Sequence, residues 1–227
     1  MSDAARIARI YALLDEAYGD ETWHWMPGVV RGPLDIIGGA ILVQHTTWRT
    51  AERALESLRG AGALDVDALA TIPEDEIAAL VRVAGTPSIK ARRLRALATM
   101  IRDVGGLDAF LALPLDTMRP LLLRTHGVGP ETADAIALYA AGRRTFVVDA
   151  YTLRLFTRLG FGPDTRSYEA WRRWFEDALP NAHATLFQRY HAWIVLHCKA
   201  VCRVTPSCAR CPLLPACEHG QRTVVGP

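Results

Sequence analysis

The stretch Leu123-Arg124-Thr125-His126-Gly127-Val128-Gly129-Pro130-Glu131-Thr132-Ala133-Asp134 decides the fold of this chain. Its two ends have helical composition, and two glycines and a proline lie between them. Gly127 and Gly129 can adopt backbone angles that are closed to other residues, and Pro130 suits the first position of a following helix. Such a turn points free amide N–H groups outward at a helix start, where a phosphate can bind. The stretch predicts a helix, a tight glycine hairpin and a second helix.

A single carboxylate follows this hairpin at a distinctive place. Asp149 comes directly after the apolar run Phe146-Val147-Val148 and directly before the amphipathic segment 150–159. That position predicts an N-cap, in which the side chain accepts a hydrogen bond from the first turn of the helix. A phosphate-binding hairpin one helix away from a lone carboxylate indicates chemistry on a nucleic acid.

The charge of the chain is small in total but unevenly distributed. The 227 residues carry a net charge of +2, and half of them are apolar. That composition supplies enough core for one large domain or two small ones. Residues 1–80 have a net charge of −7 and residues 81–227 a net charge of +9. This asymmetry is compatible with a face that meets an anionic polymer, and equally with solvated helix faces rich in arginine.

Apolar residues recur at helical spacing along most of the chain, and the breaks fall at glycine and proline. The pattern predicts an all-α protein of about ten short helices with no convincing strand. Pro33 begins a helix that is apolar on most sides, which we expect to be the buried central helix. The segment 131–141 is expected to form one helix after the hairpin, and 184–200 the last long helix.

The loop before the central helix has an unusual composition. Thr22-Trp23-His24-Trp25-Met26-Pro27-Gly28 places two tryptophans and a histidine in a segment without helical periodicity. Loops commonly carry binding and catalytic residues, so these rings are candidates for a site. The alternative is that they cover the hydrophobic core.

All five cysteines lie close to the C-terminus, four of them in the regular spacing Cys202-x5-Cys208-x2-Cys211-x5-Cys217. In a reducing compartment such crowding indicates a metal or cluster rather than disulfides. Four thiolates can surround one tetrahedral zinc ion or one [4Fe–4S] cluster. The wide loops around a single close pair differ from the paired knuckles of zinc ribbons, which favours the cluster. Cys198 lies on the last turn of a helix and is expected to be a packed thiol.

These motifs together resemble the endonuclease III superfamily of base-excision DNA glycosylases. The resemblance rests on the hairpin helix Thr132-Ala133-Asp134-Ala135-Ile136, the run Val147-Val148-Asp149 and the terminal cysteines. Segments 39–44, 90–94 and 191–197 support it by their order and spacing, and the match extends over residues 33–217. The residues look most like an endonuclease III-related branch that includes bacterial 3-methyladenine glycosylases.

The resemblance implies two helical lobes with a DNA cleft between them. One is a six-helix barrel, residues 33–144, that bears the helix-hairpin-helix. The other is a discontinuous domain, residues 1–32 and 145–227, that carries a [4Fe–4S] cluster on Cys202, Cys208, Cys211 and Cys217. The cluster is expected to be structural and to hold the loop of Arg203 and Arg210 against phosphates. A monovalent cation at the hairpin and a monomeric state are further expectations.

The implied partner is double-stranded DNA with a damaged base, which is swung out of the stack. Hairpin amides grip backbone phosphates without sequence choice. Gln44 falls where a family residue fills the space that the base leaves, and Thr86 where the family has a larger apolar wedge. His126 also fits a helix C-cap, and Tyr151 also fits packing. The residues expected to touch DNA are Gln44, Lys90, His126, Gly127, Val128, Gly129, Thr132 and Tyr151.

The implied catalytic residue is Asp149, which matches the essential aspartate of the family. Cleavage of a nucleoside C1′–N bond builds oxocarbenium-like charge on the sugar, and a carboxylate stabilises that charge. Bifunctional members add a lysine whose amine forms a Schiff base. That position holds Glu131 here, and the nearest lysines, Lys90 and Lys199, lie elsewhere. The sequence therefore predicts a monofunctional glycosylase that uses water.

The substrate is expected to be an alkylated purine such as 3-methyladenine. Electron-poor purines stack well on electron-rich rings, and the candidates for this pocket are Trp25, His45 and Trp48, with core packing as the alternative for each. Met26 stands where the branch has a second aromatic residue. Two other functions stay open: an endonuclease III-like enzyme for oxidised pyrimidines with little lyase activity, and a damage-binding protein with little catalysis.

The location of the protein is expected to be the cytoplasm of a bacterial-type cell, in association with the nucleoid. The first residues lack the layout of a signal peptide, and no apolar run approaches the length of about 18 residues that a membrane helix needs. We therefore expect no membrane partner.

Overall fold

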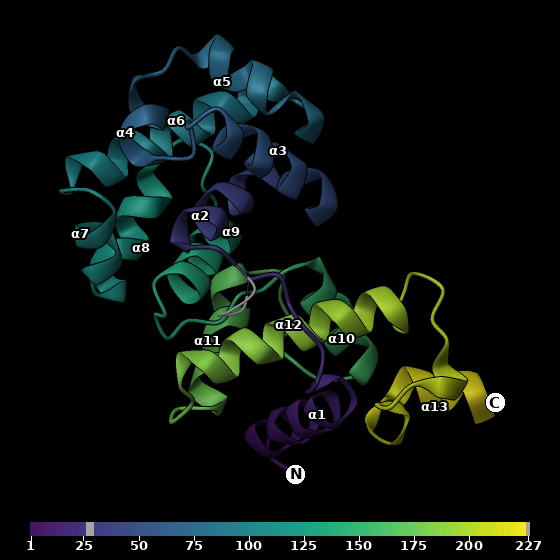
Figure 1. Cartoon of the computed structure of the whole chain (residues 1–227). Coiled ribbons are helices and arrows are strands. Elements are labelled where there is room, and N and C mark those ends of the chain that lie inside the picture. The colour runs from purple at the N-terminus through teal and green to yellow at the C-terminus, as the bar shows by residue number, and fades with distance from the viewer. Residues whose placement is uncertain (26–29, 226–227) are drawn as a thin grey trace. The chain divides into compact units, whose positions relative to one another are not determined.

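The computed structural model describes residues 1–25 and 30–225 (Figure 1). Within these ranges all the regular secondary structure is helical and there is no strand, which confirms the all-α prediction. None of the described helices is both long and apolar enough to cross a membrane. The chain forms two compact units, one of residues Met1–Trp23 and Arg144–Pro227 and the other of residues His24–Arg143. The expected domain boundaries were residues 33 and 144.

The continuous unit, His24–Arg143, is a set of short helices. They are α2 (Pro33–Leu42), α3 (Trp48–Gly60), α4 (Val66–Thr71), α5 (Glu74–Leu80), η1 (Arg82–Ala84), α6 (Pro87–Asp103), α7 (Leu107–Ala112), α8 (Leu115–Arg124), α9 (Pro130–Ala135) and η2 (Ile136–Ala140). As predicted, α2 is the buried helix, because its residues from Ile36 to Leu42 are all buried. It packs against α3, α6 and η2.

The helix expected at 131–141 is divided in the structure. It begins as α9 at Pro130 and changes at Ile136 into the single π-helical turn η2, which ends at Ala140. Such turns widen the hydrogen-bond ladder and are frequent at functional sites. The hydrophobic periodicity cannot predict the change, because every residue from Ile136 to Tyr139 is buried on all sides.

The discontinuous unit is built around α12 (Ala184–Ala200), whose bounds agree with the prediction. The helix packs on α1 (Asp3–Tyr18) and α10 (Ala150–Leu159), and α1 also contacts α11 (Tyr168–Ala178). Trp193 and Tyr190 of α12 are fully buried, and the Tyr190 hydroxyl donates to the Ile7 carbonyl at 2.9 Å. The N- and C-terminal parts of the chain therefore share one core.

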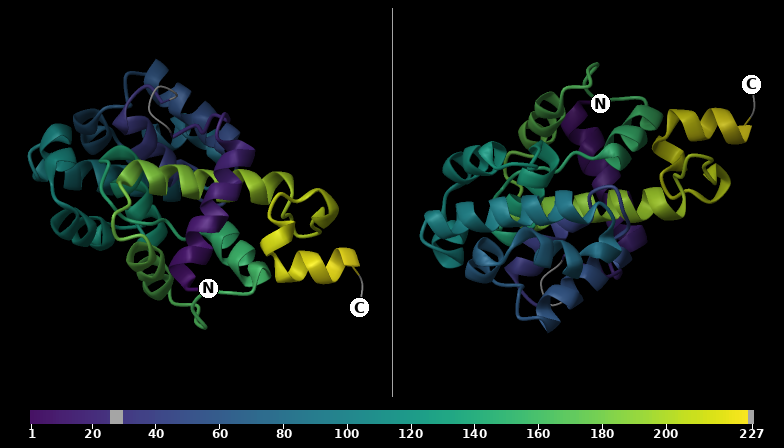
Figure 2. Two further views of the ribbon diagram at one scale, coloured as in Figure 1. Left: turned by 90° about the horizontal axis from the view of Figure 1, so that it is seen from below. Right: turned by 90° about the horizontal axis from the view of Figure 1, so that it is seen from above.

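Both views in Figure 2 show α12 running on into the C-terminal segment, drawn in yellow. This segment contains two short turns, η3 (Cys208–Arg210) and η4 (Leu214–Ala216), and a last helix, α13 (Glu218–Val225). The sequence pattern did not predict α13. It packs against α10 and against both turns, so the cysteines lie among α10, α12 and α13.

Candidate active site and nucleic-acid interface

The glycine hairpin forms as predicted between α8 and α9. Gly127 has a φ of +81°, which favours glycine, and a Cβ at this position would lie 2.2 Å from Cγ of Arg93. Gly127 is therefore required both by its backbone angle and by the side chain that covers it. The amide groups of Gly127 and Gly129 donate no hydrogen bond to any described residue, so both are available to an anion. Val128 is buried and anchors the turn.

A buried ion pair joins the two helices of the hairpin. Arg119 of α8 donates from Nε and Nη2 to the two carboxylate oxygens of Asp134 in α9, at 2.8 and 3.1 Å. The Asp134 side chain is fully buried and that of Arg119 nearly so. Bidentate geometry fixes the angle between the helices more tightly than a single contact can. The hairpin is thus a rigid platform.

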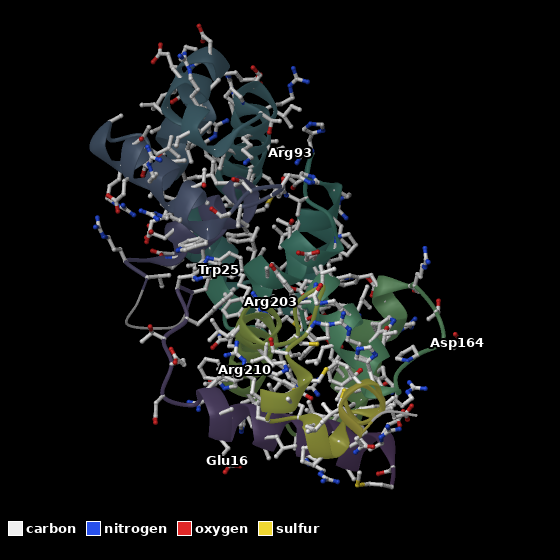
Figure 3. The ribbon with its side chains drawn as sticks, turned by 90° about the vertical axis from the view of Figure 1, so that its right-hand side faces the viewer. Glu16, Trp25, Arg93, Asp164, Arg203 and Arg210 are labelled. Atoms are coloured by element: carbon white, nitrogen blue, oxygen red, sulfur yellow. The ribbon has the colours of Figure 1, made fainter. Side chains whose placement is uncertain are left out.

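Gln44 follows the buried helix α2 and reaches the hairpin. Its Nε2 donates to the carbonyl of Gly127 at 3.2 Å and to Oγ1 of Thr132 at 3.1 Å. Arg93 in turn donates to Oε1 of Gln44. The sequence predicted Gln44 and Thr132 as DNA contacts but gave no role to Arg93, whose position on α6 is labelled in Figure 3. These residues connect α2 and α6 to the hairpin.

Two non-glycine residues in the same unit have left-handed backbone angles, His45 with a φ of 58° and Thr86 with a φ of 44°. His45 follows Gln44, and Thr86 immediately precedes α6. Such conformations cost about 1–3 kcal/mol each and concentrate at functional sites. Thr86 is one of the two positions where the resemblance places a residue that enters the opened duplex, and His45 directly follows the other, Gln44.

The expected contact between Lys90 and DNA does not fit the structure. Only 2% of Lys90 is exposed, and its Nζ donates to the carbonyls of Leu42 at 2.7 Å and Ala84 at 2.5 Å. Desolvation lowers the pKa of this ammonium group. Lys90 shares one helix face with the buried Leu94 and Leu97, a spacing that could have indicated its burial. Its role is to tie α2 and η1 to α6.

Asp149 caps α10 as predicted. One carboxylate oxygen, Oδ1, accepts from the amide of Thr152 at 2.7 Å and from its hydroxyl at 2.9 Å. The other, Oδ2, lies 3.6 Å from Nε2 of His191 on α12. Burial raises the pKa of Asp149. The hydrogen bond and the electrostatic attraction from His191, together with the hydrogen bonds from Thr152, lower the pKa by more than burial raises it, so the net shift is downward. The carboxylate is therefore held in its charged form.

The surroundings of Asp149 include groups that the sequence did not connect with it. His191 meets the ring of Trp23 edge to face, with centroids 6.3 Å apart. Lys199 Nζ lies 5.7 Å from the centroid of the Trp23 ring and 6.0 Å from that of the Tyr151 ring. Desolvation lowers the pKa of Lys199, and the opposing attraction of Asp149 offsets only part of this shift. No local pattern links these residues, because they come from α10, α12 and the segment after α1.

Glu131 lies exposed in the first turn of α9, in the continuous unit. A carboxylate cannot form a Schiff base with a sugar carbon. His126, directly before the hairpin, is also exposed. The two amines considered as substitutes for the missing lysine lie elsewhere: Lys90 inside the continuous unit and Lys199 on α12.

Four rings of the continuous unit pack directly on one another, and two of them, Trp25 and Tyr139, are buried; we call this cluster the aromatic box. Trp25 meets Trp48 edge to face at 5.8 Å and Tyr139 at 5.3 Å, and His24 stacks on Trp48 at 4.1 Å. The π-helical turn η2 supplies Tyr139. Gly39 of α2 makes room, because a Cβ there would lie 2.8 Å from the Trp48 ring. The box thus contains two of the three predicted pocket residues.

The third predicted pocket residue, His45, is exposed and makes no ring contact with the described residues of the box. Its left-handed backbone places it in the turn between α2 and α3 instead. Tyr139, which the sequence did not predict, belongs to the box, and so does His24, which the sequence offered only as a general site candidate in the aromatic loop. Met26 lies outside the described residues.

Two of the four regularly spaced cysteines, Cys202 and Cys217, accept hydrogen bonds at sulfur. Three of them, Cys202, Cys208 and Cys217, are buried, and Cys211 is half-buried. Arg158 of α10 donates to Cys202 Sγ at 3.3 Å, and the amide of Gly220 donates to Cys217 Sγ at 3.3 Å. A hydrogen bond from Cys198 lowers the pKa of Cys202 to about 6. Burial acts in the opposite direction on two others: it raises the pKa of Cys211 to about 11 and also raises the pKa of Cys217.

The four regularly spaced cysteines come from several places in the C-terminal segment. In the described part of the chain no three His, Cys, Asp or Glu side chains are arranged to hold one metal ion. A zinc ion, with bonds to sulfur of about 2.3 Å, needs its ligands close together. Cys202 follows α12, Cys208 begins η3, Cys211 lies between η3 and η4, and Cys217 directly follows η4. Cys198 is fully buried against the Tyr151 carbonyl, as a packed thiol.

Comparison with known proteins agrees with these features. Residues 39–181 match the model of the HhH-GPD superfamily of base excision DNA repair proteins. A protein of Methanocaldococcus jannaschii that bears the name of a DNA repair glycosylase is 38% identical over 214 residues, 93% of this chain and 95% of the relative. Endonuclease III of Bacillus subtilis is 28% identical over 203 residues, 84% of this chain and 83% of the relative.

Solved structures show the same fold. The Helicobacter pylori 3-methyladenine DNA glycosylase bound to 1,N6-ethenoadenine has a TM-score of 0.74 and 25% identity, over 86% of this chain and 97% of that one. An endonuclease III–DNA complex has a TM-score of 0.78 and 22% identity, over 99% and 100%. The chain belongs to the HhH-GPD superfamily, as its resemblance to endonuclease III predicted. It is a DNA N-glycosylase of base excision repair.

Proposed function

We propose that this glycosylase is monofunctional: it hydrolyses the N-glycosidic bond of alkylated purines such as 3-methyladenine and leaves the strand uncut. The observation that carries the substrate is the aromatic box of Trp25, Trp48, His24 and Tyr139. Cationic alkylpurines bind electron-rich rings by stacking and cation–π attraction. The similarity to a structure named as a 3-methyladenine DNA glycosylase supports the same class of substrate.

The chemistry is assigned to Asp149. As the C1′–N bond breaks, positive charge grows on the sugar, and an ionised carboxylate stabilises it and then orients the attacking water. His191 holds the carboxylate in its charged form at 3.6 Å, while Thr152 fixes its other oxygen. The alkylated base is already a good leaving group, so no further acid is required.

Replacing Glu131 with lysine is expected to create the missing amine. With the wild-type protein, borohydride should trap no covalent complex on DNA that contains an abasic site, because a carboxylate cannot form an imine. Glu131→Lys should yield a trapped complex, seen as a band of reduced mobility on a denaturing gel. Glu131→Gln is the matched control and should yield none. A lysine-linked complex with the wild-type protein would contradict the proposal.

Replacing Gly39 with alanine is expected to slow base release by roughly 10-fold, equivalent to about 1.4 kcal/mol of transition-state stabilisation. The added Cβ would lie 2.8 Å from the Trp48 ring and must displace it from the box. Gly38→Ala is the matched control on the same helix, since its Cβ meets only flexible leucine ends, Leu55 at 3.1 Å and Leu64 at 3.6 Å. Equal rates of 3-methyladenine release by the two variants would exclude the box as the base pocket.

We also propose that Cys202, Cys208, Cys211 and Cys217 hold a [4Fe–4S] cluster, which would brace the loop of Arg203 and Arg210 (Figure 3). Arg154 and Arg158 donate to the Cys202 carbonyl at 3.0 and 3.3 Å, so α10 holds the same loop. The bound group supplies a structural crosslink and takes no part in base removal.

The purified protein is expected to be yellow-brown, with about four irons per chain. Cys211→Ser should lose the colour and the iron, whereas Cys198→Ser should keep both because Cys198 is a packed thiol. Iron analysis and visible absorption measure the outcome. A colourless wild-type protein that contains zinc would contradict the assignment.

A further inference from the structure

An open groove beside the hairpin has no role in the function described so far. It lies in the continuous unit, between α6 and the end of α8, and encloses about 600 Å³. Its charged side chains are Arg92, Arg95, Arg124, Glu74 and Asp103, and the imidazole of His126 also lines it. We call this feature the arginine groove.

The positive charge of the arginine groove is only partly neutralised. Arg92 meets Glu74 at 3.7 Å, a long contact between two largely exposed side chains, which contributes little in water. Neither Arg95 nor Arg124 has an ion-pair or hydrogen-bond partner anywhere in residues 1–25 or 30–225. Two guanidinium groups therefore remain free to bind an anion.

The groove is continuous with the hairpin. Thr125 and His126 line it, and the next residue, Gly127, presents one of the two free amides. Helix α6 serves both features, because Arg93 packs over Gly127 while Arg92 and Arg95 line the groove. Residues three apart on a helix lie about 5–6 Å apart. A DNA strand carries one phosphate per ~3.4 Å of axis, so one strand can reach the hairpin and the groove together.

We propose that the arginine groove is a second phosphate site, which binds the backbone of duplex DNA beyond the phosphates held by the hairpin. This inference rests on the proposed function, because it takes damaged duplex DNA as the ligand. Guanidinium groups bind phosphate oxygens with paired donors and read no sequence. The groove lengthens the footprint to one side of the lesion and adds affinity.

The test is the salt dependence of binding by Arg95→Gln/Arg124→Gln to a duplex with a central abasic-site analogue. Each lost phosphate contact lowers the slope of log K against log salt by about 0.9. For the double variant, the slope of log K against log salt should therefore be smaller in magnitude by about 1.8, and its affinity for this duplex should fall. Arg102→Gln is the matched control, because Arg102 lies on α6 outside the groove and meets Asp103 at 3.9 Å.

Duplex length gives a second readout. Two further duplexes are prepared, and each is shortened on a different side of the lesion until only the hairpin footprint remains on that side. On one of them, and only one, the double variant should bind like the wild type, because the groove has no phosphate left to hold. An equal loss on both, or a slope equal to that of Arg102→Gln, would overturn the inference. Unchanged DNA binding together with weaker binding to polyglutamate would assign the groove to an acidic protein instead.

These results separate the groove from the proposed function. If the wild-type protein releases no methylated base but the slope and length effects appear, the substrate assignment fails and the phosphate site stands. If base release occurs and the slope does not change, the phosphate site fails alone.

Discussion

Asp149→Asn is expected to lower the rate of base release by about 10²- to 10⁴-fold, with little change in affinity for damaged duplex DNA. The amide has no negative charge to stabilise the developing sugar cation. The fold should survive, because asparagine caps a helix as well as aspartate does and can still accept from the Thr152 amide. Single-turnover release of methylated base measures the rate.

Asp177→Asn is the control for this experiment, since Asp177 is an exposed carboxylate on α11 of the same unit. It should leave the rate unchanged. Base release by Asp149→Asn at the wild-type rate would remove Asp149 from the mechanism.

The pH dependence of base release tests the role of His191, because the rate should fall on the acid side of the profile where Asp149 becomes protonated. The net downward shift in the pKa of Asp149 keeps its carboxylate charged. The stability from this charge is present above the unfolded pKa of about 3.9 and is lost as the pH falls through the lower folded value. Base release should accordingly persist below the usual carboxyl range. His191→Asn should move the acid limb to higher pH, whereas a purely structural histidine would lower the rate equally at every pH.

Asp134→Ala is expected to lower the free energy of unfolding by about 3–5 kcal/mol, because it leaves the Arg119 guanidinium buried without its carboxylate. The angle between α8 and α9 should no longer be fixed, so the affinity for DNA should fall as well as the stability. Unfolding in urea measures the first effect and binding to an abasic-site duplex the second.

The double variant Arg119→Met/Asp134→Leu should recover most of the lost stability, because apolar residues of similar volume replace a buried ion pair at little cost. Glu74→Gln is the control for an exposed pair and should change stability by less than about 1 kcal/mol. An equal effect of Asp134→Ala and Glu74→Gln would show that the hairpin does not depend on its buried clamp.

The predictions that succeeded rest on signals local in the sequence. The hairpin follows from two glycines before a proline, and the cap at Asp149 follows from a carboxylate before an amphipathic segment. The buried helix α2 follows from its apolar composition. Each signal spans a few residues and acts through the backbone, so it can be recognised without knowing the fold.

The contacts that were missed join residues far apart in the chain. Arg93 reaches Gln44, Tyr139 reaches Trp25 and His191 reaches Asp149, and no spacing rule connects the members of these pairs. The predicted roles of Lys90 and His45 differ from their placements because residue type was weighed above helix face and turn geometry. The burial of Lys90 could have been inferred from the helix face it shares with Leu94 and Leu97, whereas the left-handed backbone of His45 depends on the tertiary structure.

The central claim is hydrolysis of an alkylated purine without strand cleavage. The most direct test incubates the protein with methylated duplex DNA and, separately, with thymine-glycol DNA, and analyses both the free bases and the strands. Free 3-methyladenine with an intact strand is the expected result. Nicked thymine-glycol DNA without release of methylated base would contradict the claim and indicate an enzyme for oxidised pyrimidines. No release from either substrate, with tight binding to abasic-site analogues, would contradict it in favour of a damage-binding protein.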